Sequence, residues 1–267
     1  MKKVQRMEDF KYFEFIKSYV KRKKGIDLEG YRENYLFRRI KIRMAKKRCD
    51  DVLSYYNLLL KDEEEIQKLI DAIGINVSKF YRDKDVFDAI KGFILPFFKN
   101  RKDLIKIWSA GCAQGEEAFT LSILFLDSGI KNFKIFATDF DNEVLEIAKK
   151  GIFDAKDFED FPLNLKIKYI EKINEKFKVK DFVKEHIEFK IHDLLSSPFD
   201  KDFDFILCRN VLIYMKREAQ KKVFENLTSS LKKDGILVLG KVEIIHPEFE
   251  KFYLPLNLKE KIFKKIA

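Results

Sequence analysis

Apolar residues in the first quarter of the chain recur every three or four positions, between Phe10 and Ile73. This spacing places them on one face of a helix and predicts three or four short amphipathic helices. In one of these helices, Leu36, Ile40 and Met44 follow at intervals of four and form a stripe that we expect to be buried. The first domain, over residues 1–75, is therefore predicted to be all-α.

The helical pattern breaks at Asn76–Arg82 and resumes over Asp85–Asn100, where the internal Pro96 predicts a kink or an early end. Further on, short apolar runs alternate with helical stretches. The predicted strands are Leu104–Trp108, Lys134–Thr138, Ile187–Ile191, Phe203–Leu207 and Ile236–Leu239, and the predicted helices are Glu116–Asp127, Asn142–Lys149 and Arg217–Lys232. This alternation predicts an α/β domain over residues 76–267, with a doubly wound, mostly parallel sheet.

Two segments depart from simple alternation. Asp154–Glu185 is longer than an ordinary connection and contains short alternating stretches such as Lys176–Val179, so we expect a small β insertion at about residues 160–186. Phe249–Leu254 and Lys261–Ile266 are predicted to be strands joined by a polar turn. They would close the sheet with an antiparallel edge.

The positive charge of the chain is concentrated near its beginning. The whole chain has a formal net charge of +10, and Lys17–Arg48 alone carries thirteen Lys or Arg against three acidic residues. Several of these cations lie near the predicted stripe and are expected in solvent: Arg38, Arg39, Arg43, Lys46 and Lys47. Such a row favours a docking face for an acidic partner; a solvated lysine-rich surface, a thermophilic origin or a nucleic-acid site would give a similar composition.

Other bulk properties exclude several classes of protein. Hydrophobic residues make up 46% of the 267 positions, enough for the cores of two domains. Cys49, Cys112 and Cys208 show no paired spacing, so neither a disulfide framework nor a metal site is predicted. The charged segment Met1–Asp9 lacks a signal-peptide core, and no run approaches about 18 apolar residues. We therefore expect a cytoplasmic protein that is not inserted into a membrane.

Four motifs follow predicted strands, where doubly wound sheets bind their ligands. The first, Trp108–Glu117, contains Gly111 and Gly115, which permit a tight turn and a close approach of the backbone to a ligand. It is neither the three-glycine dinucleotide fingerprint nor a phosphate loop. Its two acidic residues suit a cationic ligand, or they serve only as partners of a helix dipole.

The second and third motifs suggest a nucleoside. Asp139 ends a predicted strand 28 residues after Gly111, where a carboxylate can accept hydrogen bonds from both ribose hydroxyls. Alone, it could equally cap the helix that begins near Asn142. Asp193 and Leu194 follow the next strand, where they could contact an adenine through a hydrogen bond and through packing.

The fourth motif is Cys208–Tyr214, directly after an apolar strand. Arg209 and Asn210 are expected to point into the crevice at the strand end. An arginine there is costly unless it meets an anion or a carboxylate. Tyr214 is either a site residue or a core aromatic residue.

Taken together, the motifs resemble those of the chemotaxis receptor glutamate methyltransferases, a CheR-type family that depends on S-adenosylmethionine. The family segment Asn-x-Thr/Ser-x-Phe-Phe-Arg-Asp appears here as Asn76–Asp83, with Tyr81 at one Phe position. Trp-Ser-Ala-x-x-x-x-Gly-Glu-Glu and Cys-Arg-Asn-Val-x-Ile-Tyr are matched by Trp108–Glu117 and Cys208–Tyr214. The resemblance covers nearly the whole chain and implies a Rossmann-like methyltransferase fold.

The resemblance also implies roles for single residues. S-adenosylmethionine, which leaves as S-adenosylhomocysteine, would be bound by Asn76, Ser78, Arg82, Glu117, Asp139, Asp193, Leu194, Arg209 and Asn210. The residues near the transferred methyl group, and hence the catalytic ones, would be Arg82, Arg209 and Tyr214. The family usually has Asn where this chain has Asp193.

The implied acceptors are glutamate side chains on the cytoplasmic helices of chemotaxis receptors, on which the row of cations would dock. A glutamate with an ordinary pKa of about 4.3 is ionised at neutral pH, so the displacement needs no general base. Two departures from the family are that Gly240–Glu243 lacks a serine and that Tyr169–Val179 is short and has no glycine loop to grip a receptor pentapeptide. We therefore expect a monomeric enzyme that works without that tether.

Two other functions are compatible with parts of the sequence. An RNA methyltransferase would use the basic helices, but Cys208–Val211 is not the Asn/Asp-Pro-Pro-aromatic sequence typical of amino methylation of bases, so no nucleic-acid partner is expected. A non-catalytic interaction module is disfavoured because the residues at every cofactor position are intact.

Overall fold

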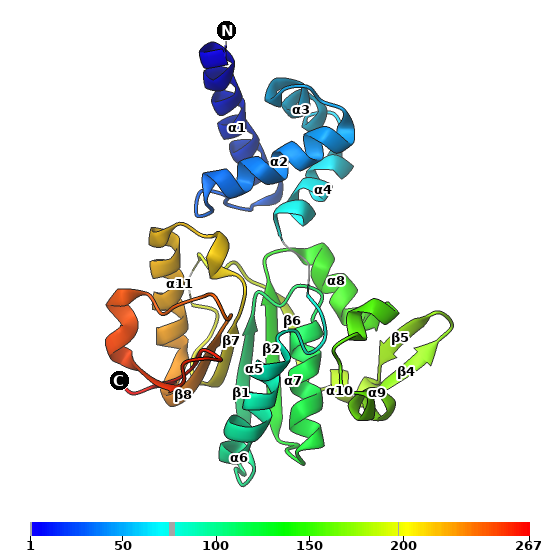
Figure 1. The fold of residues 1–267 in the computed structure, drawn as a ribbon, viewed down its shortest axis with the longest axis vertical. Helices are drawn as coiled ribbons and strands as arrows, with labels where there is room; N and C mark the ends of the chain where they lie inside the picture. The colour runs from blue at the N-terminus through cyan, green and yellow to red at the C-terminus, as the bar shows by residue number, and fades with distance from the viewer. Residues whose placement is uncertain (1, 75–77, 197) are drawn as a thin grey trace. The chain divides into compact units, whose positions relative to one another are not determined.

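The computed structural model describes residues 2–74, 78–196 and 198–267, with side chains from residue 9 onward. The chain forms two compact units (Figure 1): Met1–Asn76 with Tyr214–Ala219, and Val77–Ile213 with Gln220–Ala267. Over the described residues, no helix is both long and apolar enough to cross a membrane.

The described part of the first unit is largely helical, as predicted. Its helices are α1 (Lys2–Lys24), α2 (Glu33–Lys47), α3 (Val52–Leu59) and α4 (Glu63–Ile73). The side chains of Asp51 and Asp62 accept hydrogen bonds from the backbone N–H groups of Ser54 and Glu65, which caps α3 and α4 at their first turns.

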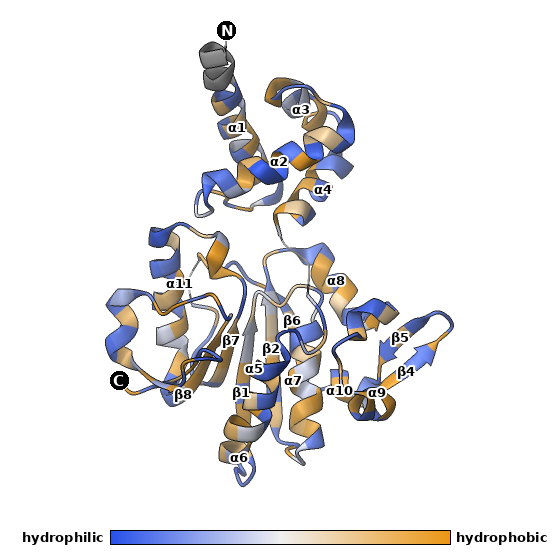
Figure 2. Ribbon diagram, viewed as in Figure 1, coloured by the Kyte–Doolittle hydropathy of each residue, from blue (hydrophilic) through white to orange (hydrophobic). Residues whose placement is uncertain are grey.

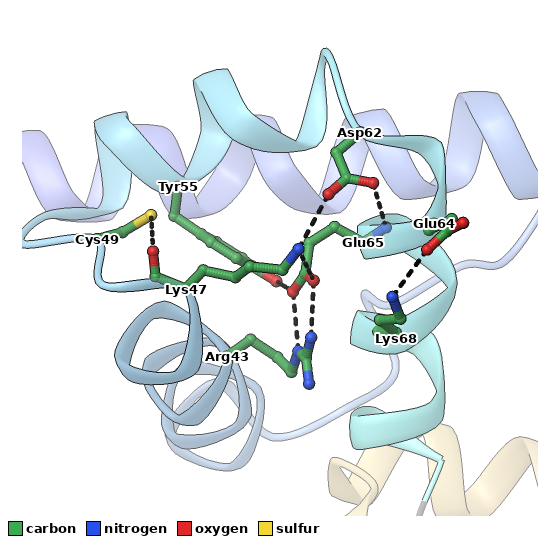
Figure 3. Close-up of polar contacts among 8 residues, drawn as sticks. All are labelled: Arg43, Lys47, Cys49, Tyr55, Asp62, Glu64, Glu65 and Lys68. Carbon is green, nitrogen blue, oxygen red and sulfur yellow. Dashed lines mark hydrogen bonds and ion pairs between the residues drawn. The ribbon is translucent and has the colours of Figure 1, made fainter.

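Of the two faces predicted for α2, the buried one is confirmed and the solvent-exposed one is only partly correct. Leu36, Ile40 and Met44 are buried, so the predicted stripe is confirmed. The prediction that Arg43 lies in solvent is wrong: its side chain is buried, and its Nε and Nη2 donate to the two carboxylate oxygens of Glu65 at 2.8 and 2.7 Å (Figure 3). A buried arginine is stable there because α4 supplies the opposite charge.

The second unit contains a sheet with strand order β6-β2-β1-β7-β8-β10-β9. Its parallel strands are β1 (Ile105–Ala110), β2 (Phe133–Asp139), β6 (Ile187–Ile191), β7 (Phe203–Cys208) and β8 (Leu231–Leu239), and its antiparallel edge consists of β9 (Tyr253–Asn257) and β10 (Ile262–Lys265). The predicted doubly wound, mostly parallel sheet is confirmed. The chain leaves β1 toward β2 and β6 and returns on the other side as β7, so the topological switch point lies between β1 and β7.

The helices of the second unit follow the predicted alternation closely. They are α5 (Lys84–Ala89), α6 (Leu95–Phe98), α7 (Glu116–Asp127), α8 (Asn142–Lys150) and, with its first residues in the other unit, α11 (Arg217–Ser230). Between α5 and α6 lies a π-helical turn, η1 (Ile90–Ile94), in which the N–H of Leu95 donates to the carbonyl of Ile90. The wider turn accommodates Pro96, which has no N–H and whose ring would clash with the carbonyl four residues earlier.

The predicted β insertion is present. It consists of β3 (Ile152–Phe153), β4 (Ile170–Ile173) and β5 (Lys176–Val179), in the order β3-β5-β4, with the helical segments η2 (Ala155–Phe158), α9 (Leu163–Tyr169) and α10 (Asp181–Lys184). The β4–β5 hairpin projects from the second unit at the right of Figure 1. Only Asn174 and Glu175 connect the two strands, and Asn174 takes the left-handed conformation with φ 54°.

One predicted strand begins late. The segment predicted as a strand over Phe249–Leu254 starts as a 3-10 helix, η4 (Pro247–Phe252), and extends only from Tyr253. Pro247 favours a first helical turn because its fixed φ suits that position and its missing N–H is not needed there.

The core of the second unit is rich in aromatic residues that belong to the sheet and to α7. Trp108, the one tryptophan of the chain, is fully buried, and its Nε1 donates to Thr138 Oγ1 at 2.9 Å. Phe119 and Phe205 are likewise fully buried. Figure 2 shows β7 as predominantly hydrophobic, as expected for a central strand of a sheet covered on both faces, whereas the β4–β5 hairpin is largely hydrophilic.

Candidate functional site

The turn between β1 and α7 forms a cradle at the carboxyl end of the sheet. Gly111 and Gly115 have φ 74° and 88°, and a Cβ at Gly111 would lie 2.6 Å from Val211 Cγ2, so a glycine is required there. The N–H groups of Gly111 and Cys112 both donate to the carbonyl of Thr138, at 2.8 and 2.9 Å. These bonds tie the turn to β2.

Asp139 ends β2 beside this cradle. Its carboxylate accepts hydrogen bonds from the backbone N–H groups of Ala113 at 3.0 Å and Asp141 at 3.1 Å. Burial raises the pKa of Asp139 to about 6, against the opposing effect of these hydrogen bonds. The carboxylate therefore lies where the sequence predicted a ribose partner, at the end of the strand next to the glycine turn.

Asp193 and Leu194 lie at the same edge. The N–H of His192 donates to the backbone carbonyl of Asp139 at 2.9 Å, which places the segment after β6 beside the end of β2. The Asp193 carboxylate accepts the N–H of Leu195 at 2.9 Å, and the Leu194 side chain is buried. The sheet thus brings the second and third motifs together.

Arg209 connects three separate segments of the second unit. Its Nη1 donates to Glu117 at 2.9 Å, and its Nη2 donates to Asp83 at 2.8 Å and to the carbonyl of Arg82 at 3.2 Å. The side chain is only 2% exposed, and the guanidinium lies 5.2 Å from the centroid of the Phe87 ring. The carboxylates that a buried arginine needs at this place therefore come from the protein itself.

The segment that supplies Asp83 has an unusual backbone. Tyr81 and Asp83 both have φ 60°, in the left-handed region that residues other than glycine rarely adopt, and Arg82 lies between them with a partly exposed side chain. Asn76, which the resemblance assigned to the cofactor, lies outside the described residues. Ser78 is described, and it hydrogen-bonds to Glu116.

Glu116 belongs to the first motif, but the resemblance assigned it no role of its own. It is buried at the start of α7, and among the described residues its Oε2 has no hydrogen-bond partner. Burial raises its pKa to about 7, although the bond from Ser78 acts in the opposite direction. Two adjacent glutamates at a helix start look alike in sequence, and only the fold decides which of them is buried.

Asp83 and Glu243 were missed as well. Asp83 ends the segment Asn76–Asp83 that carried the resemblance, and Glu243 ends Gly240–Glu243, which differs from the family by its missing serine. Asp83 binds Arg209. The Glu243 carboxylate binds backbone N–H groups of the loop that follows β7. Neither role could be derived from sequence, because each depends on a partner more than thirty positions away.

Tyr214, one of the predicted catalytic residues, does not belong to the same unit as Arg209. It belongs to the first unit, where its ring stacks on Tyr35 with 4.6 Å between the centroids. The N–H of Arg32 donates to the Tyr214 carbonyl at 2.9 Å.

The cations predicted to dock a partner fall into two groups. Arg38 and Lys46 are exposed, while Arg39 is partly buried with its guanidinium 5.2 Å from the Tyr35 ring centroid. Arg43 and Lys47 are ion-paired with Glu65, at 2.7 and 3.3 Å. Only the first group presents charge to solvent without an ion pair among the described residues.

These residues fit the predicted cofactor, S-adenosylmethionine. The turn at Gly111 and Gly115 lies at the carboxyl end of β1, next to the topological switch point where doubly wound sheets bind their ligands. Asp139 supplies acceptors for hydroxyl groups, and Glu117 at the start of α7 supplies a carboxylate that it shares with Arg209.

Comparisons with known proteins agree with this assignment. Residues 76–260 match the family model described as "CheR methyltransferase, SAM binding domain", and residues 11–73 match "CheR methyltransferase, all-alpha domain". A chemotaxis protein methyltransferase of Listeria monocytogenes is 32% identical over 244 residues, which is 90% of this chain and 92% of that protein. One from Borreliella burgdorferi is 34% identical over 236 residues, 83% of each chain.

A solved structure was also found, at lower similarity. A putative S-adenosyl-L-methionine-dependent methyltransferase from Methanococcus maripaludis aligns with a TM-score of 0.38 and 16% identity, over 69% of this chain and 87% of that one. This similarity is too low to add to the family matches.

Proposed function

The chain belongs to the CheR methyltransferase family, and from this premise we propose that it methylates glutamate side chains on the cytoplasmic helices of chemotaxis receptors. One observation carries the proposal: Arg209 binds Glu117 and Asp83, so three family motifs meet at one guanidinium beside the cofactor cradle. The products are glutamate methyl esters and S-adenosylhomocysteine.

Bound S-adenosylmethionine supplies an electrophilic methyl group on a sulfonium. Glu117, Asp139, Asp193, Leu194, Arg209 and Asn210, together with Asn76, Ser78 and Arg82, are assigned to hold it. The acceptor glutamate is already ionised at neutral pH, so the protein need not remove a proton. Its task is to orient the acceptor carboxylate and to exclude water, because the reaction neutralises two opposite charges and is favoured in a dry site.

The environments of the two arginines support different roles. The charge of Arg209 is offset by Glu117 and Asp83, so Arg209 positions these groups without quenching an incoming carboxylate. We assign the acceptor carboxylate to Arg82, whose side chain is partly exposed and whose carbonyl accepts from Arg209. Tyr214 is proposed to contact the transferred methyl group.

The first domain, residues 1–75, is proposed to dock the acidic receptor helices. Arg38 and Lys46 are the exposed cations of α2 that support this role, with Arg39 beside them. Arg43 and Lys47 are assigned to the fold of the unit, because Glu65 binds both. Surface charges of this kind steer association more than they add affinity.

The β4–β5 hairpin supports recognition without a receptor pentapeptide. Its two-residue connection, Asn174 and Glu175, contains no glycine and leaves no loop that could close around a peptide. We propose a cytoplasmic, monomeric enzyme that reads receptor helices directly. A pentapeptide that bound the protein with a Kd below roughly 10 μM, about 7 kcal/mol of binding free energy, would contradict this.

The test is transfer of labelled methyl groups from S-adenosylmethionine to a purified receptor cytoplasmic fragment. We expect label that base releases as methanol, which identifies an ester, and its loss when the acceptor glutamates are replaced by alanine. Arg82→Ala should lower the rate at saturating cofactor more than it lowers cofactor affinity. Labelling of RNA instead of the receptor would overturn the proposal.

A further inference from the structure

Glu243 is buried in a way that apolar packing does not explain. It is 3% exposed, while its neighbours Val242 and Ile244 are 72% and 67% exposed. The usual order of burial is therefore reversed in this short segment, and a carboxylate is rarely buried without specific partners.

The partners are four backbone N–H groups. Glu243 Oε2 accepts from Gly240 at 2.6 Å and from Asn210 at 3.0 Å, and Oε1 accepts from Val211 at 2.9 Å and Leu212 at 2.7 Å. Three of these amides are consecutive, a backbone arrangement that forms an anion-binding concavity. Here the anion is part of the chain.

The amides belong to the residues that directly follow Arg209. Asn210 has φ 61°, and its N–H is fixed by the Glu243 carboxylate. Fixing the backbone at this residue also fixes the directions in which Arg209 and Asn210 leave the end of β7. The carboxylate thus connects the loop after β8 with the loop that carries two assigned cofactor residues.

Gly240 makes the close approach possible. A Cβ at this position would lie 2.7 Å from Glu243 Oε2 and 2.8 Å from the backbone nitrogen of Asn210. Its φ lies outside the left-handed region, so alanine would crowd these contacts without straining its own backbone. Steric crowding alone should therefore disturb the same bonds that removal of the charge disturbs.

We infer that Glu243 is a positioning residue for the cofactor site: its carboxylate holds the turn Arg209–Leu212 in the conformation that presents Arg209 and Asn210 to S-adenosylmethionine. This inference rests on the proposed function for the assignment of those two residues. It concerns cofactor binding only, so it can be tested without any receptor.

The test is titration of S-adenosylhomocysteine into wild type, Glu243→Gln and Gly240→Ala. A glutamine keeps the shape but turns an NH2 group toward two of the four backbone N–H groups, whichever way its amide lies. We expect both variants to bind at least tenfold more weakly than wild type, at a temperature where thermal unfolding shows each to be folded.

Gly235→Ala is the matched control. A Cβ at Gly235 would lie 2.7 Å from Leu231 Cδ1, so the site is equally crowded, but it lies five residues earlier on β8, roughly 16 Å away at about 3.3 Å per residue. The control should lose stability and keep its affinity. If Glu243→Gln unfolds, Gly240→Ala decides the question.

Wild-type affinity in folded Gly240→Ala, or an equal loss of affinity in Gly235→Ala, would overturn the inference. Failure of the proposed function would appear differently. Binding of S-adenosylhomocysteine would then remain normal in wild type, while the receptor fragment would stay unmethylated.

Discussion

Glu65 in the first unit and Glu243 in the second are both buried carboxylates that bind several partners, yet the partners differ in kind. Glu65 is bound by the side chains of Arg43, Tyr55 and Lys47, as Figure 3 shows. Glu243 is bound by backbone N–H groups. One carboxylate joins helices, and the other fixes the path of the main chain.

The pKa values of the two carboxyls move in opposite directions. Arg43, Tyr55 and Lys47 together outweigh the effect of burial and lower the pKa of Glu65. Burial is the largest effect on Glu243, and its pKa is raised although four N–H groups bind it. The two carboxylates, each with several hydrogen-bond donors, are therefore expected to respond to pH in opposite ways.

The largest expected effect lies in the first unit. Glu65→Ala leaves Arg43 buried without its partner, and breaking a buried ion pair in this way costs about 3–5 kcal/mol of unfolding free energy. Urea denaturation followed by hydrogen exchange in α2 and α4 would measure it. Affinity for S-adenosylhomocysteine should be unchanged at temperatures where the unit is folded.

Glu64→Ala is the control for this prediction. Glu64 is on the same helix and pairs with Lys68, but its side chain is 83% exposed, so its loss should cost less than about 0.5 kcal/mol. Equal effects of the two substitutions would show that the Glu65 network does not stabilise the unit.

Next in size is the response of the two units to pH. The pKa of Glu116 is raised from 4.5 to about 7. This carboxyl group therefore makes its full contribution to the stability of the second unit below pH 4.5, and the contribution is lost as the pH rises through 7. The loss amounts to roughly 3 kcal/mol at 1.36 kcal/mol per unit. Trp108 lies in this unit and reports its unfolding by fluorescence.

For Glu65 the sign is reversed. Its pKa is lowered, so its stabilising effect is complete above pH 4.5 and is lost as the pH falls through the lowered value. Acid should therefore lower the stability of the first unit through protonation of Glu65, whereas protonation of Glu116 should raise the stability of the second unit. Glu116→Gln should flatten the dependence of Trp108 unfolding between pH 5 and 8; an unchanged slope would assign it to another group.

A smaller effect is expected on cofactor binding. Asp139 has a pKa of about 6, and only its ionised form can accept hydrogen bonds from two hydroxyls with both oxygens. Affinity for S-adenosylhomocysteine should fall about tenfold, or 1.4 kcal/mol, as the pH is lowered from 7 to 5. Asp139→Asn should bind weakly at both pH values, and a variant that keeps the pH dependence would exclude Asp139 as its source.

The smallest effect concerns the surface of the first unit. Reversal of Arg38 and Lys46 to Glu should slow receptor methylation severalfold at low salt, with little change at high salt and none in cofactor affinity. Reversal of Lys102 and Lys131, exposed in the second unit just before β1 and β2 begin, is the matched control. An equal effect of the two pairs would indicate a response to net charge rather than docking.

Local patterns were sufficient to predict most elements of the fold. The helix Glu116–Asp127 and the strand Ile187–Ile191 have the predicted bounds, because a glycine turn starts the one and a strict alternation of apolar and charged residues defines the other. The same reasoning failed for Arg43, whose environment is decided by Glu65, 22 positions away. A helical pattern shows which face is apolar but not which cation finds a buried partner.

The residues of the candidate site were only partly predictable from the sequence. Asp139, Asp193 and Arg209 follow strands, and the parallel sheet brings strand ends together whatever the connections contain. The role of Glu243 could not be predicted in the same way. Its partners are backbone amides, which nearly every residue type carries, so no pattern of side chains reveals them.

The left-handed backbone at Ala113 has a consequence for engineering. A residue with a Cβ costs roughly 1–2 kcal/mol in that conformation, and glycine relieves the cost. Tyr81 shares the conformation, but its ring is buried, so glycine there would remove more packing than the strain it relieves. Ala113 has only a methyl group to lose and lies in the turn that shapes the site, so selection for heat resistance alone would favour glycine there. Such a variant would gain thermal stability and lose definition of the turn, which makes this position the first to exclude from a library meant to keep activity.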